Sequence, residues 1–207
     1  MESKFLTLKL NNCFKGRHMD KYSNFKLKID AKPSLFHGRT VRKAVGQSLW
    51  YRIRDHILQK DTPVCSICGF SPQPDEMRNL HLHEIEDYDF ENIVVTLSGL
   101  NLICANCHAF HHFGFTQLYS SKEKMERLIE HFAKVNECEI NDFKDYRRSL
   151  LFRLQPEAET KKTKTNLSFQ DIKAGNYTVR YAIIGDIPFK DEVIDKLNKK
   201  GVYYQYK

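Results

Sequence analysis

Alternating apolar and polar positions predict strands near the N-terminus and in the middle of the chain. Near the N-terminus, period-two alternation runs through residues 5–10 and 25–30, with turn-forming residues between them. In the middle, residues 80–85 and 93–97 form a second pair of strand patterns around an acidic turn at residues 86–89. We therefore expect one antiparallel pair in each region.

Apolar residues that recur every four positions predict helices elsewhere. This repeat runs from Val41 to Ile57, so we expect a single helix over residues 39–60, which Pro63 terminates. Two further apolar stripes lie between residues 120 and 154 and predict two more helices. Strands and helices in this arrangement predict an α+β fold.

Composition divides the chain into four parts. Residues 156–166 are polar and charged, and we interpret them as a linker. After it, residues 167–207 contain a strand, a short helix and a second strand pattern at 202–206, which together predict a small β-α-β appendage. Before the linker, we expect the N-terminal strands in residues 1–38 and a central domain with flanking helices in residues 39–155.

Four of the six cysteines form two Cys-x-x-Cys pairs within the central domain. Cys65 and Cys68 make the first pair, and Cys104 and Cys107 make the second. Two such turns can present four thiolates to one cation in the tetrahedral arrangement that Zn²⁺ prefers. Four core cysteines or two disulfides are the alternatives. The pairing favours a structural zinc site, which we expect to fold with the metal.

Histidines near the cysteines indicate a second metal site. His108 and His112 are four positions apart and would share one face of a helix. His83 lies in a predicted strand, with His81 on the same face and Glu84 on the other. Surface or hydrogen-bonded core histidines are the alternative. Their grouping around the cysteines favours a site with a second divalent cation instead.

These residues resemble the HNH endonucleases, in which a ββα-metal fold holds one divalent cation between a hairpin and a helix. Several members of that family also carry a four-cysteine zinc site. The resemblance implies that His83, His108 and His112 hold the cation, which would be Mg²⁺, Mn²⁺, Ni²⁺ or Zn²⁺. Asn101 takes the position of the family's asparagine, and Glu84 stands where the family has a histidine as general base.

The resemblance implies a metal-dependent endonuclease that hydrolyses phosphodiester bonds in nucleic acid, with DNA as the expected substrate. Its catalytic residues would be Glu84, His83, Asn101 and His108. Because Glu84 replaces a histidine, two other assignments stay open: Glu84 as a metal ligand, or His81 as the base. The alternative function is a catalytically inactive, zinc-stabilised module of HNH fold that binds nucleic acid or protein.

The charge of the chain suits a polyanionic partner. Its formal net charge is +7, and basic side chains supply most of the affinity of proteins for phosphate backbones. Candidate phosphate contacts lie on the helix expected before the first cysteine pair: Arg39, Arg42, Lys43 and Arg54. We find no signal peptide and no apolar run long enough to span a membrane, so we expect a cytoplasmic protein.

Overall fold

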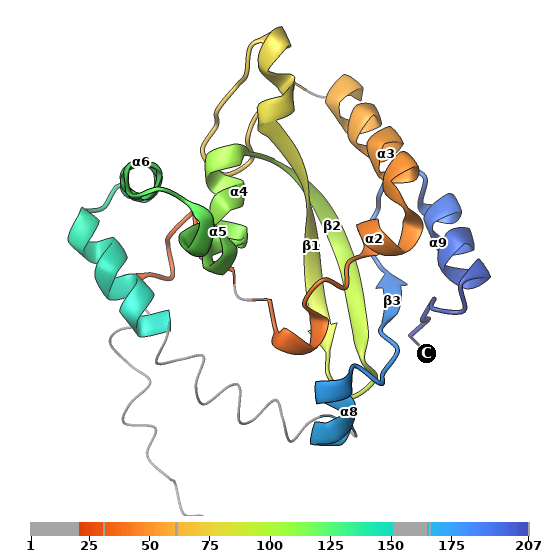
Figure 1. The fold of residues 1–207 in the computed structure, drawn as a ribbon. Coiled ribbons are helices and arrows are strands. Elements are labelled where there is room, and N and C mark those ends of the chain that lie inside the picture. The colour runs from red at the N-terminus through yellow and green to blue at the C-terminus, as the bar shows by residue number, and fades with distance from the viewer. Residues whose placement is uncertain (1–20, 31, 61, 151–164, 166, 207) are drawn as a thin grey trace, which may run out of the picture.

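The fold combines helices with a small three-stranded sheet, so the α+β prediction is confirmed (Figure 1). The structure is a computed structural model that describes residues 21–30, 32–60, 62–150, 165 and 167–206. Residues 140–150 are helical. The other elements, in chain order, are η1 (Ser34–Phe36), α2 (Val41–Val45), α3 (Gln47–Lys60), η2 (Pro74–Asn79), β1 (Leu80–Asp89), β2 (Val94–Cys104), α4 (Ala105–His111), α5 (Phe113–Tyr119), α6 (Lys122–Asn136), α8 (Phe169–Ala174), β3 (Arg180–Ile183) and α9 (Lys190–Lys199).

β1 and β2 form a long antiparallel hairpin. Its register runs from Leu80 opposite Cys104 to Asp89 opposite Val94, with an irregularity between Ile85 and Glu86. The acidic residues 86–89 therefore belong to β1, and the turn expected there is wrong. Side chains of a strand alternate between a buried and a solvated face, and the solvated face accepts acidic residues. A run of polar residues therefore did not mark the end of the strand.

β3 joins the same sheet on the other side of β2 and runs parallel to it. Val94 pairs with Arg180 at one end, and Leu97 pairs with Ile183 at the other. The second strand expected at residues 202–206 is wrong, because only an isolated bridge forms there, between Tyr203 and Tyr181. Most of the expected linker lies outside the described residues.

A glycine interrupts the helix that the apolar repeat predicts over residues 39–60. Gly46 adopts φ 92° and ψ 155°, a conformation that glycine reaches without steric cost. The single-helix prediction is therefore wrong, and the segment forms α2 and α3 instead. Apolar spacing survives the break because Val45 and Leu49 still face the same core.

Residues 25–30 do not form the expected strand, and the chain bends at residues 26 and 27. The Leu27 N–H donates to Asn136 Oδ1 at 2.9 Å, and Asn136 Nδ2 donates back to the Leu27 carbonyl at 2.9 Å. The Ile29 N–H donates to the Tyr146 hydroxyl at 3.1 Å. Helix side chains thus satisfy the backbone groups that a partner strand would otherwise pair. The strand expected nearer the N-terminus lies outside the described residues.

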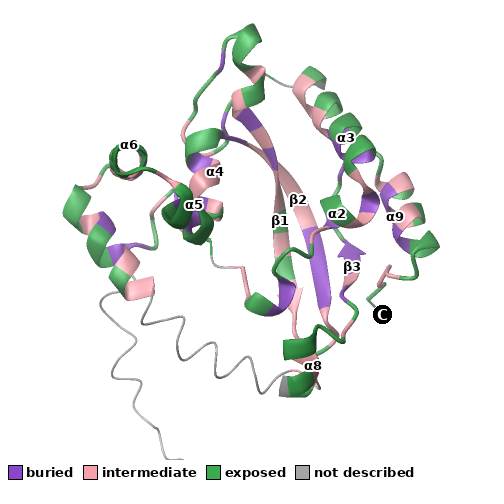
Figure 2. Cartoon of the chain, viewed as in Figure 1, coloured by how far each residue is buried: buried purple, intermediate pink, exposed green. Residues whose placement is uncertain are grey.

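The buried apolar residues of the described chain form two clusters, and the buried positions of Figure 2 lie in the hairpin and in the helices beside it. The first packs Leu82 and Val95 of the sheet against α2, α3 and α9, with the fully buried Trp50 at its centre. The second surrounds the cysteines and includes Phe110 and Phe132, both 0% exposed. α4 therefore lies fixed between the hairpin and α6, which is the placement that a site shared by hairpin and helix requires.

Candidate metal centre

The first cysteine pair lies in a tight turn just before the hairpin. The Cys65 N–H donates to the Phe70 carbonyl at 2.8 Å, and the Gly69 N–H donates to the Cys65 carbonyl at 2.9 Å. Gly69 has φ +73°, which lets the chain reverse directly after Cys68. The Ser66 N–H donates to the Leu102 carbonyl at 2.9 Å, so this turn is bonded to β2.

The second pair lies where β2 passes into α4. Cys104 is the N-cap of α4, and its Sγ accepts a hydrogen bond from the Cys107 N–H at 3.4 Å. The four sulfurs of Cys65, Cys68, Cys104 and Cys107 lie within 4.8 Å of one another and could hold a metal ion. Hydrogen bonds from Cys104 and Cys107 hold the pKa of Cys65 well below its usual range, so a thiolate is available there.

His131 of α6 contacts the cysteine group from outside it. Its Nε2 lies 3.2 Å from Cys107 Sγ. Burial lowers the pKa of His131, so the ring is neutral near pH 7 and can donate one N–H to the sulfur. A hydrogen bond of this kind orients a metal ligand. Sequence reasoning missed His131, because a lone histidine on an amphipathic helix carries no spacing signal.

The three histidines predicted as ligands of the second cation come together beside the hairpin. One ligand atom each of His83, His108 and His112 lies within 4.8 Å of the other two. β1 supplies His83 and α4 supplies His108. His112 lies at the junction between α4 and α5, with φ −121° and ψ 36°. The break between the two helices thus places the His112 side chain beside those of His83 and His108.

The histidines of this group are in the form that binds metal. Burial, with the nearby imidazoles adding to it, lowers the pKa of His83 to about 3 and the pKa of His108 to about 3. The pKa of His112 is also lowered, again mainly by burial. All three rings are therefore neutral at pH 7 and offer a lone pair to a cation.

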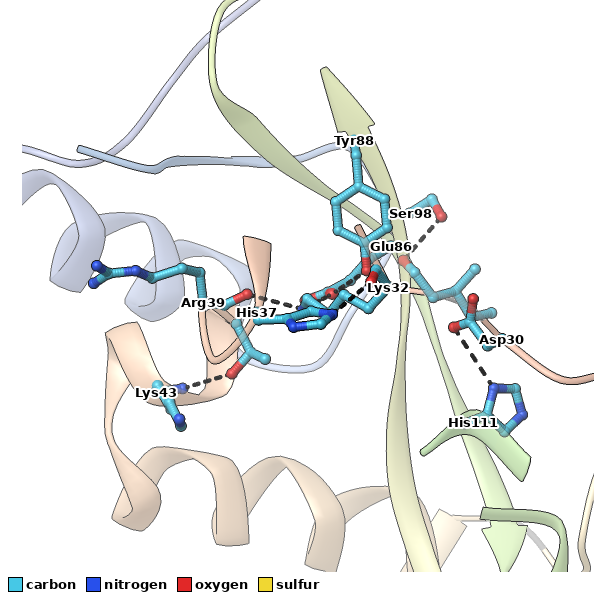
Figure 3. Close-up of polar contacts among 11 residues, drawn as sticks. Asp30, Lys32, His37, Arg39, Lys43, Glu86, Tyr88, Ser98 and His111 are labelled. Atoms are coloured by element: carbon cyan, nitrogen blue, oxygen red, sulfur yellow. Dashed lines mark hydrogen bonds and ion pairs between the residues drawn. The ribbon is translucent and has the colours of Figure 1, made fainter. Parts of the chain in front are cut away.

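A second group overlaps the first and was not predicted. Asp30, His83 and His111 each offer one ligand atom within 4.8 Å of the others. His111 Nδ1 lies 3.9 Å from Asp30 Oδ2 (Figure 3). His111 stands directly before His112 in the sequence, and this adjacency could have directed attention to it. Asp30 had no such signal, because it reaches the site from a segment far away in the sequence.

Two other residues of the predicted site lie next to the histidines. Asn101 on β2 is directly opposite His83 on β1. His81 lies on the same face of β1 as His83, and its ring stacks on that of His108, with centroids 4.7 Å apart and planes 6° apart. Burial lowers the pKa of His81, so this ring is also neutral at pH 7.

Glu84 belongs to none of the three groups of described residues that could hold a metal ion. Neighbouring side chains of a strand point to opposite faces, so Glu84 is directed away from His83. Burial, together with the charge of Glu86, raises the pKa of Glu84 to about 7. Glu86 in turn accepts from Lys32 Nζ at 2.6 Å and from the Tyr88 hydroxyl at 3.0 Å (Figure 3).

Comparison with known proteins adds no relative. No protein-family model, curated protein or solved structure matches this chain. The resemblance to HNH endonucleases therefore stays a prediction from the motifs, and function is argued from the geometry of the site. Within the described parts of the chain, no helix combines the length and apolarity needed to cross a membrane.

The predicted phosphate contacts fall into two kinds. Arg39, Arg42 and Lys43 are exposed at and just before α2. Arg54 is different, because its Nη2 donates to the Met77 carbonyl at 2.8 Å and to a second carbonyl at the start of β1. Arg54 thus fastens α3 to the hairpin. The exposed three are the residues whose side chains can reach a phosphate backbone.

Proposed function

We propose that this protein is a metal-dependent endonuclease of HNH type that hydrolyses phosphodiester bonds in nucleic acid, with DNA as the expected substrate. One observation carries the proposal. Three neutral imidazoles, His83 from the hairpin and His108 and His112 from the helical side, converge on one point. Structural histidines rarely converge in this way, whereas a hairpin and a helix that share one cation are the defining feature of the family.

The four-cysteine group supports the proposal by fixing the helix to the hairpin. We propose that Cys65, Cys68, Cys104 and Cys107 hold a structural Zn²⁺, since four sulfur ligands within 4.8 Å of each other suit this ion. Three of these side chains are buried, and Cys68 is half-buried. Closed coordination by four protein ligands is typical of a structural site, while the histidine group, with three ligands, leaves positions for water or substrate.

The second cation, when bound, would stabilise charge on the scissile phosphate and lower the pKa of a bound water. His83, His108 and His112 would hold it. Asn101, opposite His83 on β2, is placed to orient the site from the second strand. His81 shares the face of His83, so we assign the proton-accepting role to His81 in preference to Glu84, which is directed to the other face.

A cleavage assay with matched variants separates the three assignments. If His81 accepts the proton, His81→Ala abolishes cleavage and keeps the cation, while Glu84→Gln cuts nearly as well as wild type. If Glu84 were the base, Glu84→Gln would lose cleavage with the cation retained. If Glu84 were a ligand, the same change would weaken metal binding as well. His56→Gln, an exposed histidine on α3, is the control.

The enzyme proposal has a clear negative outcome. Wild-type protein that cleaves neither DNA nor RNA with Mg²⁺, Mn²⁺, Ni²⁺ or Zn²⁺ present would overturn it. A folded, zinc-loaded chain that binds nucleic acid without cleavage would then support the inactive binding module of the same fold.

The salt dependence of DNA binding tests the proposed grip on the backbone. Each phosphate contact contributes about −0.9 to the slope of log K against log salt, so Arg42→Ala with Lys43→Ala should flatten the slope by about 2. Arg52→Ala is the matched control, since Arg52 is exposed but already paired with Glu192 at 2.9 Å. An unchanged slope in the double variant would place the phosphate contacts elsewhere.

A further inference from the structure

We propose that Asp30, His83 and His111 form a second cation position beside the one that the endonuclease proposal needs. Ligand atoms of these three side chains lie within 4.8 Å of one another. Asp30 and His111 belong to no other such group among the described residues. The position therefore adds the His111 imidazole, at the end of α4, and the Asp30 carboxylate, which comes from a segment outside the hairpin and α4.

His111 supplies the observation that points to a ligand. Both of its ring nitrogens are buried, and neither has a hydrogen-bond partner among the described residues. Its nearest charged neighbour, Asp30 Oδ2, is 3.9 Å from Nδ1, which is too long for a hydrogen bond. Buried polar atoms nearly always have a hydrogen bond, so a buried imidazole without one, beside a carboxylate and a second imidazole, requires an explanation. A cation between the three side chains provides one.

The backbone holds Asp30 in place for this role. Its N–H donates to the Phe110 carbonyl of α4 at 3.3 Å, directly before His111 in the sequence. The preceding residue, Ile29, donates its N–H to the Tyr146 hydroxyl. The carboxylate therefore reaches the cluster from a fixed segment. The Asp30 side chain is 49% exposed, so a cation beside it keeps access to solvent.

The ligand chemistry differs between the two positions. His83, His108 and His112 are all imidazoles, a set that suits Zn²⁺ or Ni²⁺, whereas a carboxylate among the ligands favours harder ions such as Mn²⁺. His83 belongs to both groups, and a neutral imidazole has one lone pair. We therefore expect one cation at a time, held by His83 and either of the two pairs of partners.

Mn²⁺ binding to the zinc-loaded full chain tests this position, with electron paramagnetic resonance reporting free Mn²⁺. The variant His108→Gln/His112→Gln removes the first position and keeps His83. We expect it to retain one Mn²⁺ site. Adding Asp30→Asn should weaken that site by about tenfold or more, since even outer-shell changes reduce metal affinity roughly 10–100-fold. Asp145→Asn in the same background is the control, because Asp145 pairs with Arg148 elsewhere.

Two results would overturn the proposal: no Mn²⁺ bound by the double variant, or Mn²⁺ bound equally with and without Asp30→Asn. Circular dichroism identifies a double variant that fails to fold. The single variant His108→Gln is then compared with His108→Gln/Asp30→Asn, and equal Mn²⁺ affinity of those two would also overturn it. Because the measurement is metal binding, a wild-type chain that cleaves nothing leaves this position intact and refutes only the endonuclease.

Discussion

Asn136→Ala should destabilise the protein strongly, because the Asn136 side chain holds the backbone of a distant segment. The Asn136 amide both donates to and accepts from the backbone of Leu27, with both bonds at 2.9 Å. Leu27 is 0% exposed, so water cannot replace the lost partner. A buried backbone group left unpaired costs ~1–3 kcal/mol, which for a donor and an acceptor together gives ~2–6 kcal/mol. Domains of this kind have ~5–15 kcal/mol in total.

Urea unfolding of the zinc-loaded chain, at fixed metal concentration, measures this loss. With a slope of about 2 kcal/mol per molar urea, the midpoint should fall by about 1–3 M. Asn136→Asp keeps the acceptor and should fall between Asn136→Ala and wild type. Asn141→Ala is the control, because Asn141 accepts only an exposed bond from Lys144. If Asn136→Ala unfolded at the wild-type midpoint, side chains would not be what holds residues 25–30, and the placement of Asp30 would lose its basis.

Three further outcomes follow from the same structure. Cys104→Ser should lose the tightly held zinc and unfold or aggregate, since binding of structural zinc is also folding free energy; elemental analysis and circular dichroism measure both, and a stably folded zinc-free wild type would contradict it. Gly185→Ala should lower the thermal midpoint, because a Cβ there would overlap the Ser98 carbonyl, at a cost of ~1–3 kcal/mol; an unchanged midpoint would show that β3 can shift. Chelation that removes zinc should shift Trp50 fluorescence as the core unfolds, and an unchanged spectrum would show that the packing around Trp50 does not depend on the metal.

The candidate metal ligands were predictable because their signal is local. Cys65 and Cys68, like Cys104 and Cys107, are held three positions apart by one turn, so spacing along the chain corresponds to spacing in space. His108 and His112, four positions apart, likewise lie close together because one helical turn joins them. Nothing local distinguishes Asp30, whose carboxylate reaches the site only because a distant helix side chain holds the preceding backbone.

Extended structure was harder to predict than the ligands, for a physical reason. Alternation identifies a chain that is buried on one side, as residues 25–30 are, but it does not say what pairs with the backbone. There the partners are the Asn136 amide and the Tyr146 hydroxyl. Likewise, the pattern near residue 180 predicts a strand correctly, while its pairing with β2 depends on tertiary contacts that alternation does not encode.

The parallel pairing of β3 with β2 has a consequence for synthesis of the chain on the ribosome. Val94, Val95 and Leu97 are each 0% exposed in the complete sheet, and their partners arrive only with residues 180–183. Until those residues leave the exit tunnel, the nascent hairpin presents an unpaired apolar edge, which is a template for pairing with other chains. Contacts between such distant residues also slow folding. A nascent chain stalled before residue 180 should therefore recruit chaperones that the released full-length chain does not.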